Sequence, residues 1–417
     1  MDLKPTPNPL PEPDPSRAAD CNEGDAELGA LLEVCVREDA SDLHLSPDNP
    51  VWLRVHGHLE PRPEVFGAML DDAMIERIAD ALAQRGNVHW CEQRGSVDGA
   101  LVSPSGARFR FNLFRRQGRR AVALRRLEDR FRSLQELGLP DSLYQLCDLP
   151  DGLVVVAGPT GAGKSTTLAT LIDRINQNRR CHIVTIEDPI EYLHTPIQSL
   201  VNQRQVGADA PSFNEALVAA LRQDPDVILV GEIRDLVTIS TAITAAETGH
   251  LVFTTVHAGD CVGAIERLVS VFPAEQQVGI RKQLSLVLRC VVAQHLLVAD
   301  GPRSRARDES STPSALVQAE GASAAGRRQR VAMSEVLMVN SAIANLIAQG
   351  KSSQIYSAIE TGTGDGMQTM EHNAAQLMVS GQISEAAAMS VARQPQMVRE
   401  RARMLRQRGF VPNGGGR

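Results

Sequence analysis

The chain has 417 residues and a formal net charge of -7; 43% of the residues are hydrophobic and 22% are charged. This length fits two or three domains, and the composition excludes fibrous and wholly disordered proteins. The acidic balance argues against a protein whose main role is to coat duplex DNA.

The N-terminal third is predicted to form a tail and a small α+β domain. Residues 1–25 are crowded with Pro, Asp and Glu and are predicted to be a disordered tail. The domain that follows, residues 26–132, combines helical periodicity with the alternation of exposed and buried residues typical of strands. Its predicted elements are a helix at 26–40, a strand at 51–57, a helix at 71–84, and a hairpin of strands at 107–114 and 121–127 with a Gln-Gly turn.

Residues 133–393 are predicted to form a larger α/β domain. Short apolar runs alternate with helical segments, which is typical of a parallel sheet with crossover helices. Residues 300–330 are rich in Ser, Ala, Gly and Arg and are predicted to be a flexible insertion. Residues 394–417 are predicted to be a basic C-terminal tail that contains a solvated helix at 399–408. The predicted strands are 153–157, 182–186, 227–230, 251–255 and 331–337, and the predicted C-terminal helices are 341–349, 352–361, 369–380 and 384–392.

Cysteine spacing and hydropathy indicate the compartment. The seven cysteines lie far apart without any C-x-x-C pair, so the sequence predicts neither a disulfide framework nor a structural zinc site, but reduced thiols in a cytoplasm. The N-terminus lacks an apolar segment of the signal-peptide type, and no run approaches the ~20 apolar residues that cross a bilayer. Any membrane role is therefore expected to go through a partner.

A complete G-x-x-x-x-G-K-S phosphate loop lies between the first apolar run of the larger domain and a helical segment. Its glycines allow backbone N–H groups to face phosphate oxygens, Lys164 is suited to bridge the β- and γ-phosphates, and Ser165 is suited to ligate Mg²⁺. The sequence therefore predicts ATP as ligand, with Mg²⁺. The predicted binding residues are Gly158, Pro159, Thr160, Gly161, Ala162, Gly163, Lys164, Ser165 and Thr166.

Acidic residues follow two further predicted strands. Glu232 comes just after the strand 227–230, and Glu187 just after the strand 182–186. The carboxyl ends of parallel strands meet at one edge of a sheet, so both side chains are predicted to lie near the phosphate loop and to act in hydrolysis. Gly231 stands where many phosphate-loop enzymes have Asp, which assigns more of the polar role to Glu232. His257 follows a fourth strand and is a further candidate.

These motifs, in their order and spacing, resemble the four conserved boxes of the secretion ATPase superfamily of type II secretion and type IV pili. The boxes are residues 158–165, 185–191, 228–232 and 249–257. The chain is most similar to the PilT-type twitching-motility retraction ATPases, with the PilU branch as a near neighbour, and the resemblance covers about residues 26–385. The assembly ATPases of these systems usually carry a four-cysteine zinc module, and the missing cysteine pairs disfavour that branch.

The resemblance implies a PAS-like N-terminal domain, a RecA-like ATPase domain and a hexameric ring. It implies a cytoplasmic motor that works at the inner membrane on a pilus platform protein, with a paralogous motor ATPase as a further possible partner. In the family, two arginines of the N-terminal domain with a 15-residue separation reach the nucleotide phosphates. Arg110 and Arg125 have that separation and lie on the predicted hairpin, so the resemblance assigns them this role.

One departure leaves alternatives open. The retraction motif Ala-Ile-Arg-Asn-Leu-Ile-Arg-Glu of the family reads Ala-Ile-Ala-Asn-Leu-Ile-Ala-Gln at 342–349. A paralogue that binds ATP and modulates a partner motor, and a type II secretion ATPase, therefore remain alternatives to a retraction motor. A motor on nucleic acid is disfavoured by the acidic charge and by the 3% aromatic content, which offers few stacking platforms for single strands.

Overall fold

The computed structural model describes residues 15–55, 58–86, 95–127, 130–299 and 330–407, with side chains from residue 23 onward. The chain divides into two compact units, the first ending at residue 129 and the second beginning at residue 130. Within the described residues, no helix combines the length and the apolar character needed to cross a membrane. The predicted insertion at 300–330 lies, except for residue 330, outside the described residues.

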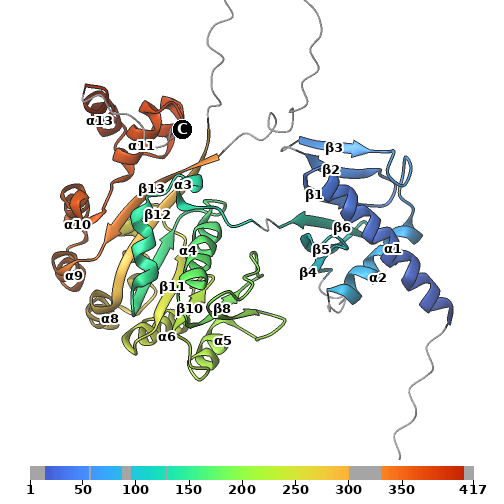
Figure 1. Ribbon diagram of the computed structural model, residues 1–417, viewed down its shortest axis with the longest axis horizontal. Helices are drawn as coiled ribbons and strands as arrows, with labels where there is room; N and C mark the ends of the chain where they lie inside the picture. Colours follow the sequence, from blue (N-terminus) through green and yellow to red (C-terminus); the bar gives the residue numbers. More distant parts are fainter. Residues whose placement is uncertain (1–14, 56–57, 87–94, 128–129, 300–329, 408–417) are drawn as a thin grey trace, which may run out of the picture. The chain divides into compact units, whose positions relative to one another are not determined.

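The first unit is a six-stranded antiparallel sheet with two helices packed against it (Figure 1). The strand order is β3-β2-β1-β6-β5-β4, and buried side chains of both helices share one core with the sheet. This is the predicted small α+β arrangement. The elements are α1 (Pro15–Arg37), β1 (Ala40–Leu45), β2 (Val51–Val55), β3 (His58–Arg62), α2 (Asp72–Arg85), β4 (Ser96–Val102), β5 (Arg108–Arg116) and β6 (Arg119–Arg126).

The hairpin predicted from the alternating segments is confirmed as β5 and β6. Gln117 and Gly118 join the strands with φ of 53° and 80°, as in the two-residue turns that match the right-handed twist of strands. The resulting register places Arg110 directly opposite Arg125.

The N-terminal helix differs from the prediction. Helix α1 begins at Pro15, within the segment predicted to be a disordered tail, while residues 1–14 lie outside the described residues. Asp25 and Glu27 of α1 form ion pairs with Arg85 and Arg77 of α2, and Gly24 is buried against Arg77. These contacts join residues 50 to 60 positions apart, so local composition does not reveal them.

The second unit is built on a seven-stranded sheet of order β13-β12-β7-β11-β10-β8-β9, in which all neighbouring pairs except β12–β13 are parallel. The predicted parallel-rich α/β fold is therefore confirmed. The strands are β7 (Gly152–Ala157), β8 (His182–Glu187), β9 (Leu200–Gln205), β10 (Val227–Val230), β11 (Leu251–Val256), β12 (Leu288–Val298) and β13 (Arg330–Met338). The helices are α3 (Leu134–Leu137), η1 (Asp141–Asp148), α4 (Lys164–Asn178), α5 (Phe213–Ala220), α6 (Leu236–Glu247), α7 (Cys261–Ser270), α8 (Ala274–Val287), α9 (Ser341–Ala348), α10 (Ser352–Thr361), η2 (Gly362–Asp365), α11 (Met370–Val379), α12 (Glu385–Val391) and α13 (Pro395–Gln407).

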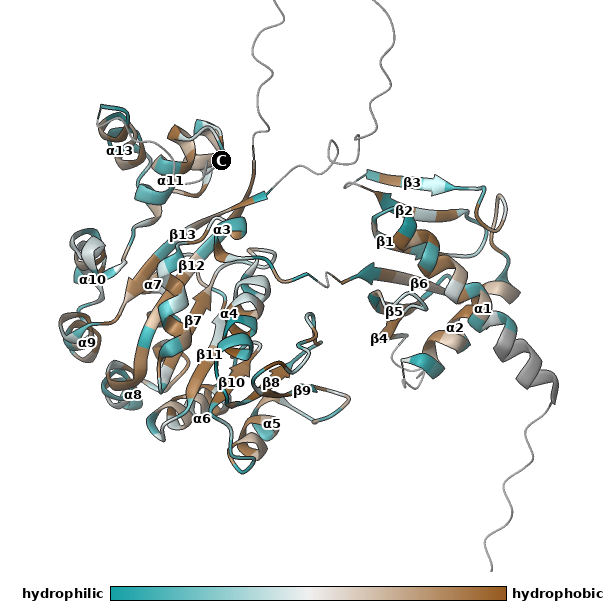
Figure 2. Cartoon of the chain, in the orientation of Figure 1, coloured by the Kyte–Doolittle hydropathy of each residue, from teal (hydrophilic) through white to brown (hydrophobic). Residues whose placement is uncertain are grey.

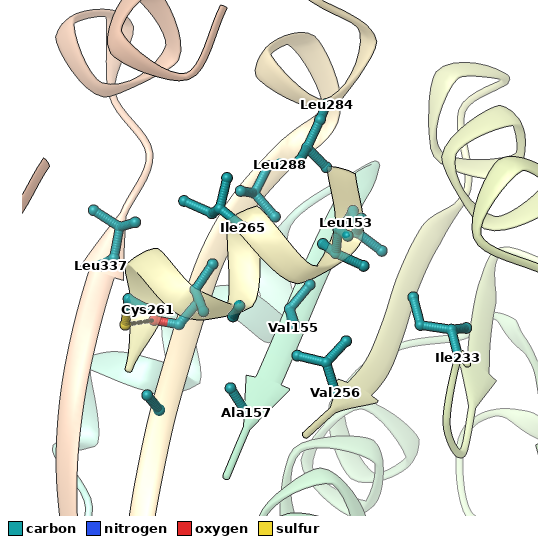
Figure 3. Packing of buried hydrophobic residues seen from close by; sticks show 14 of the residues in the cluster. Leu153, Val155, Ala157, Ile233, Val256, Cys261, Ile265, Leu284, Leu288 and Leu337 are labelled. Atoms are coloured by element: carbon teal, nitrogen blue, oxygen red, sulfur yellow. Dashed lines mark hydrogen bonds between the residues drawn. The ribbon is translucent and has the colours of Figure 1, made fainter. Parts of the chain in front are cut away.

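Both faces of this sheet are buried, which explains its continuous apolar runs. Along β7, Leu153 and Val155 belong to one core cluster, whereas Val154 and Val156 belong to the cluster that also holds α4. Figure 3 shows the first cluster, where Ile265 of α7 packs near β7 and β12. The central strands are accordingly the most hydrophobic part of the unit (Figure 2).

The helix predicted within the basic tail is confirmed as α13, but it is packed against the second unit rather than solvated. Residues 408–417 lie outside the described residues. Val398 and Ala402 are buried in the core. Arg401 donates a hydrogen bond to Glu360 (2.6 Å), and Arg399 donates one to Glu385 (2.7 Å). The arginine-rich composition therefore conceals the buried apolar side of this helix.

Two leucines of helix α8 provide a matched test of packing in the core of the second unit. Leu284 is fully buried, whereas Leu286 on the same helix is 69% exposed. We expect Leu284→Ala to lower the free energy of unfolding of the second unit by about 2–5 kcal/mol through lost burial and a cavity. Leu286→Ala should change it by no more than about 0.5 kcal/mol. Urea denaturation followed by circular dichroism measures both, and equal losses would show that the assigned burial is wrong.

Candidate active site

The phosphate loop lies between β7 and α4, as predicted. Gly158, Gly161 and Gly163 have φ of 155°, 78° and 86°, values that residues with a Cβ rarely adopt. A Cβ at Gly158 would lie 2.4 Å from the backbone oxygen of Gln294, so only glycine fits there. Ala162 is buried, whereas Pro159 and Thr160 are exposed on the loop.

Lys164 begins α4 and holds a buried positive charge against the loop. Its Nζ donates hydrogen bonds to the backbone oxygens of Gly158 (2.9 Å) and Pro159 (3.0 Å), and the residue is only 9% exposed. Burial lowers the pKa of Lys164, while the carboxylates of Glu232 and Glu191 act to raise it. A loop with this charge, next to the N-terminus of a 15-residue helix, fits a polyanionic ligand such as a nucleotide phosphate.

The phosphate loop is also held in place by the side chain of Gln294 in β12. Its amide donates to the backbone oxygen of Ala162 (2.7 Å), and its side-chain oxygen accepts a hydrogen bond from Thr167 of α4 (2.9 Å). Gln294 is 1% exposed, so both bonds are shielded from water. One side chain therefore holds the loop and the start of α4 together.

Glu232 and His257 meet at the ends of β10 and β11. One carboxylate oxygen of Glu232 accepts from Arg234 Nη2 (2.7 Å), and the other lies 3.7 Å from His257 Nε2. Burial and the nearby charge of Lys164 lower the pKa of His257, whereas Glu232 acts to raise it. The charge interactions of Lys164 with both residues put these three side chains in one neighbourhood.

Glu187 is the last residue of β8 and is only partly exposed. Its Oε1 accepts hydrogen bonds from Thr185 Oγ1 (2.7 Å) and Gln203 Nε2 (3.2 Å). Burial raises the pKa of Glu187, and these bonds act to lower it. The neighbouring strand end is Gly231, where a Cβ would lie 3.2 Å from the backbone oxygen of Ile186 and 3.4 Å from Glu187 Cα. This close approach explains why glycine stands where aspartate is common.

The segment after Glu187 is bonded to the phosphate-loop helix. The hydroxyl of Tyr192 lies 3.1 Å from Thr166 Oγ1. The ring of Phe131 stacks on His194 with a 4.7 Å centroid separation and lies 5.7 Å from Tyr192. The first residues of the second unit thus cover the segment that follows Glu187.

Arg110 and Arg125 lie in the first unit, on adjacent strands of its sheet. Arg125 Nε donates to Asp42 Oδ1 (2.8 Å), with 70% of the arginine side chain exposed. Arg110 Nη2 lies 3.9 Å from Asp98 Oδ1, with 42% of its side chain exposed. Because they are directly opposite each other, both side chains lie on the same face of the sheet with part of their surface exposed, and their role at the nucleotide stays a prediction.

The sequence analysis did not identify Gln294, Gln203 and Tyr192, whose side chains form hydrogen bonds around the site. Gln294 is a polar residue within the mainly apolar segment 288–298. A polar residue inside a buried strand is the local signal that could have indicated its role. Gln203 and Tyr192 carry no comparable signal, because β9 lacks both an apolar run and a regular alternation.

Residues 25–396 match the family model described as Type II/IV secretion system protein. The chain belongs to this family. It is 39% identical over 376 residues to the type IV pilus retraction ATPase PilT of Pseudomonas aeruginosa, covering 89% of this chain and 99% of that protein. It is 34% identical over 367 residues to the type IV pilus ATPase PilU of the same organism, covering 88% of each chain.

Solved structures agree with this assignment. The crystal structure of the pilus retraction motor PilT with bound ADP has a TM-score of 0.77 and 37% identity, covering 89% of this chain and 98% of that one. The Legionella pneumophila ATPase DotB has a TM-score of 0.66 and 25% identity, covering 87% of this chain and 94% of that one. The resemblance seen in the sequence motifs is therefore confirmed, and the relatives are ATPases.

Replacing Gln294 tests its support of the phosphate loop. Gln294→Leu removes two buried hydrogen bonds and leaves the oxygen of Ala162 without this donor, which costs about 1–3 kcal/mol. We expect ATP affinity to fall by about tenfold, measured by equilibrium titration with a fluorescent ATP analogue. Gln145→Leu, at an exposed position of η1, is the control. Unchanged affinity in Gln294→Leu would contradict the supporting role.

Proposed function

We propose that this chain is a hexameric, Mg²⁺-dependent motor ATPase that couples ATP hydrolysis to type IV pilus retraction. The observation that carries the proposal is the arrangement at one sheet edge. A complete phosphate loop with a buried Lys164 lies beside Glu232 and His257, and Glu187 ends the neighbouring strand β8. Similarity over nearly the full length of PilT supports the specific motor class.

The phosphate loop supplies binding and charge. The backbone of residues 158–163 and the side chain of Lys164 bind the β- and γ-phosphates, and Thr166 lies next to them at the start of α4. The Ser165 hydroxyl is the candidate ligand for Mg²⁺, and a bound Mg²⁺ would neutralise charge on the phosphate oxygens. The exposed Ser165 hydroxyl suits a hard cation that retains several waters. Glu232, whose charge acts on the neighbouring Lys164, supplies a carboxylate to the same site.

Glu232 is the first candidate for orienting the attacking water, and Glu187 is the second. Glu232 lies next to Lys164 and keeps one oxygen toward His257. His257, whose pKa is lowered, is suited as a neutral hydrogen-bonding partner near the γ-phosphate. Glu187 is held more firmly, by Thr185 and Gln203.

Arg110 and Arg125 are the candidate arginine fingers. Their exposed guanidinium groups, opposite each other on β5 and β6, can reach a ligand outside their own unit. A planar guanidinium stabilises charge that develops on a transferred phosphoryl group.

The proposed setting is the cytoplasmic face of the inner membrane, with a pilus platform protein as partner and no nucleic-acid substrate. The second candidate function is an accessory paralogue that joins a partner motor. Helix α9, which corresponds to the retraction motif, favours this alternative: residues 341–349 carry no ionisable side chain, and Gln349 donates to Asn345 on its exposed face (2.7 Å).

The variant Glu232→Gln tests the proposed motor. The amide keeps the shape but is a poor proton acceptor, so ATP binding should persist while turnover falls by about 10²-fold or more. Steady-state phosphate release and nucleotide titration measure the two quantities, and pilus retraction in cells should stop. Glu275→Gln, at an exposed position of α8, is the control. If affinity collapses while turnover per bound nucleotide is unchanged, Glu232 is structural and Glu187 takes its place.

Mixed rings test the arginines. We expect Arg125→Ala alone to lower turnover by about 10³-fold or more, and Lys164→Ala alone to abolish it. If the finger acts between subunits, a mixture of the two variants should regain turnover that neither shows alone. Arg116→Ala, at the exposed end of β5, is the control. Full activity of both Arg110→Ala and Arg125→Ala would show that neither arginine acts in hydrolysis.

A further inference from the structure

One glutamine side chain on the edge strand β9 bonds to three points around Glu187. Gln203 Nε2 donates to Glu187 Oε1 (3.2 Å) and to the backbone oxygen of Tyr192 (2.8 Å). Its Oε1 accepts from the backbone N–H of His194 (2.8 Å). All hydrogen-bonding groups of this amide are thus directed to the Glu187 carboxylate and to the segment that follows it.

The orientation of this amide is fixed by its partners. The His194 N–H can only donate, so it must face the amide oxygen. The Glu187 carboxylate and the Tyr192 carbonyl can only accept, so they must face the two N–H groups. A rotated amide would break all three bonds, which leaves one arrangement.

The segment held by Gln203 is itself attached to the phosphate-loop helix. The Tyr192 hydroxyl meets Thr166 Oγ1, two residues after Lys164. The rings of Tyr192 and His194 are covered by Phe131. Gln203 therefore links the carboxylate at the end of β8 to the same body that carries the phosphate loop.

We propose that Gln203 is a positioning residue for ATP hydrolysis, which holds the Glu187 carboxylate in one orientation relative to the phosphate loop. Glu187 has χ angles that its strand does not fix, and its other side-chain donor, Thr185, lies on the same strand. Gln203 supplies the contact from a different strand. The inference rests on the proposed hydrolysis of ATP, but not on the coupling of hydrolysis to a pilus.

The charged groups and donors around Glu187 predict how its ionisation changes when the Gln203 donor is lost. The backbone N–H of Glu191 acts to lower the pKa of Glu187, whereas the charge of Glu191 acts to raise it. Glu232 follows the adjacent strand end, Gly231, which contacts Glu187. Thr185 and Gln203 are the side-chain donors that favour the ionised form. Removing the Gln203 donor should therefore shift the ionisation of Glu187 to higher pH.

The test compares two isosteric substitutions on β9. Gln203→Glu keeps an oxygen for the His194 N–H, loses both donors and adds a negative charge. Asn202→Asp adds the same charge to the exposed opposite face of the strand, where Asn202 lies 2.8 Å from His182 Nε2. Gln203→Met keeps the approximate volume without either charge or donors, so it separates loss of the bond from added repulsion. Thermal melting confirms that each variant is folded.

We expect Gln203→Glu to lower kcat by at least about tenfold, with ATP affinity within about threefold of the wild type, because the phosphate loop is untouched. The acidic limb of the kcat–pH profile should move to higher pH, since this proposal makes turnover depend on ionised Glu187. Gln203→Met should show the loss in kcat with a smaller pH displacement. Asn202→Asp should change neither quantity.

Two results would overturn the inference. One is a kcat and acidic limb for Gln203→Glu equal to those of Asn202→Asp; the other is an unchanged kcat in Glu187→Gln, which leaves no carboxylate to position. Wild-type protein that hydrolyses ATP without driving pilus retraction would refute the motor proposal alone. The comparison of the Gln203 variants would then still be valid, because it measures only kcat for ATP hydrolysis.

Discussion

The nucleotide site depends on the close approach of two backbone segments that are more than 130 residues apart in the sequence. Gly158 at the end of β7 lies so near the backbone oxygen of Gln294 in β12 that no Cβ fits between them. The side chain of Gln294 then continues past this point to bond Ala162 and Thr167. The shape of the phosphate loop is therefore determined partly by a strand outside its motif, and pairing of β7 with β12 is a condition for forming it.

Close approach of strand ends also determines the arrangement of Glu187 and Glu232. Gly231 lets the ends of β8 and β10 approach, and its N–H donates to the backbone oxygen of Ile186 (2.8 Å). Thr255 of β11 donates to the oxygen of Gly231 (2.7 Å). The three strand ends are thus joined in a row, which places Glu187, Glu232 and His257 along one edge. A Cβ at position 231 would lie 3.2 Å from the backbone oxygen of Ile186 and would crowd this approach.

Residue patterns predicted the central strands, the phosphate loop and the position of the carboxylates at strand ends, because these signals are local; the roles of the carboxylates stay predictions. Buried parallel strands must be apolar throughout, and the loop needs glycines at fixed spacing. The supports of the site were missed because they are non-local. Gln294 and Gln203 acquire their roles from partners on other elements, and Asp25 and Glu27 of α1 form ion pairs that reach across to α2. The helix at residues 395–407 was expected, but its arginines predicted a solvated helix and concealed the buried face that Val398 and Ala402 provide.

Helix α9 has a consequence for the kind of contact this protein can make. Ile343 and Ile347 face the core, whereas Ala342, Asn345 and Gln349 face outward without any formal charge. Salt screens interactions between exposed charges over about 10 Å at 0.1 M, but it has little effect on apolar contact and on hydrogen bonds between neutral groups. An interface formed through this helix would therefore persist at ionic strengths that weaken a contact built on arginine and glutamate.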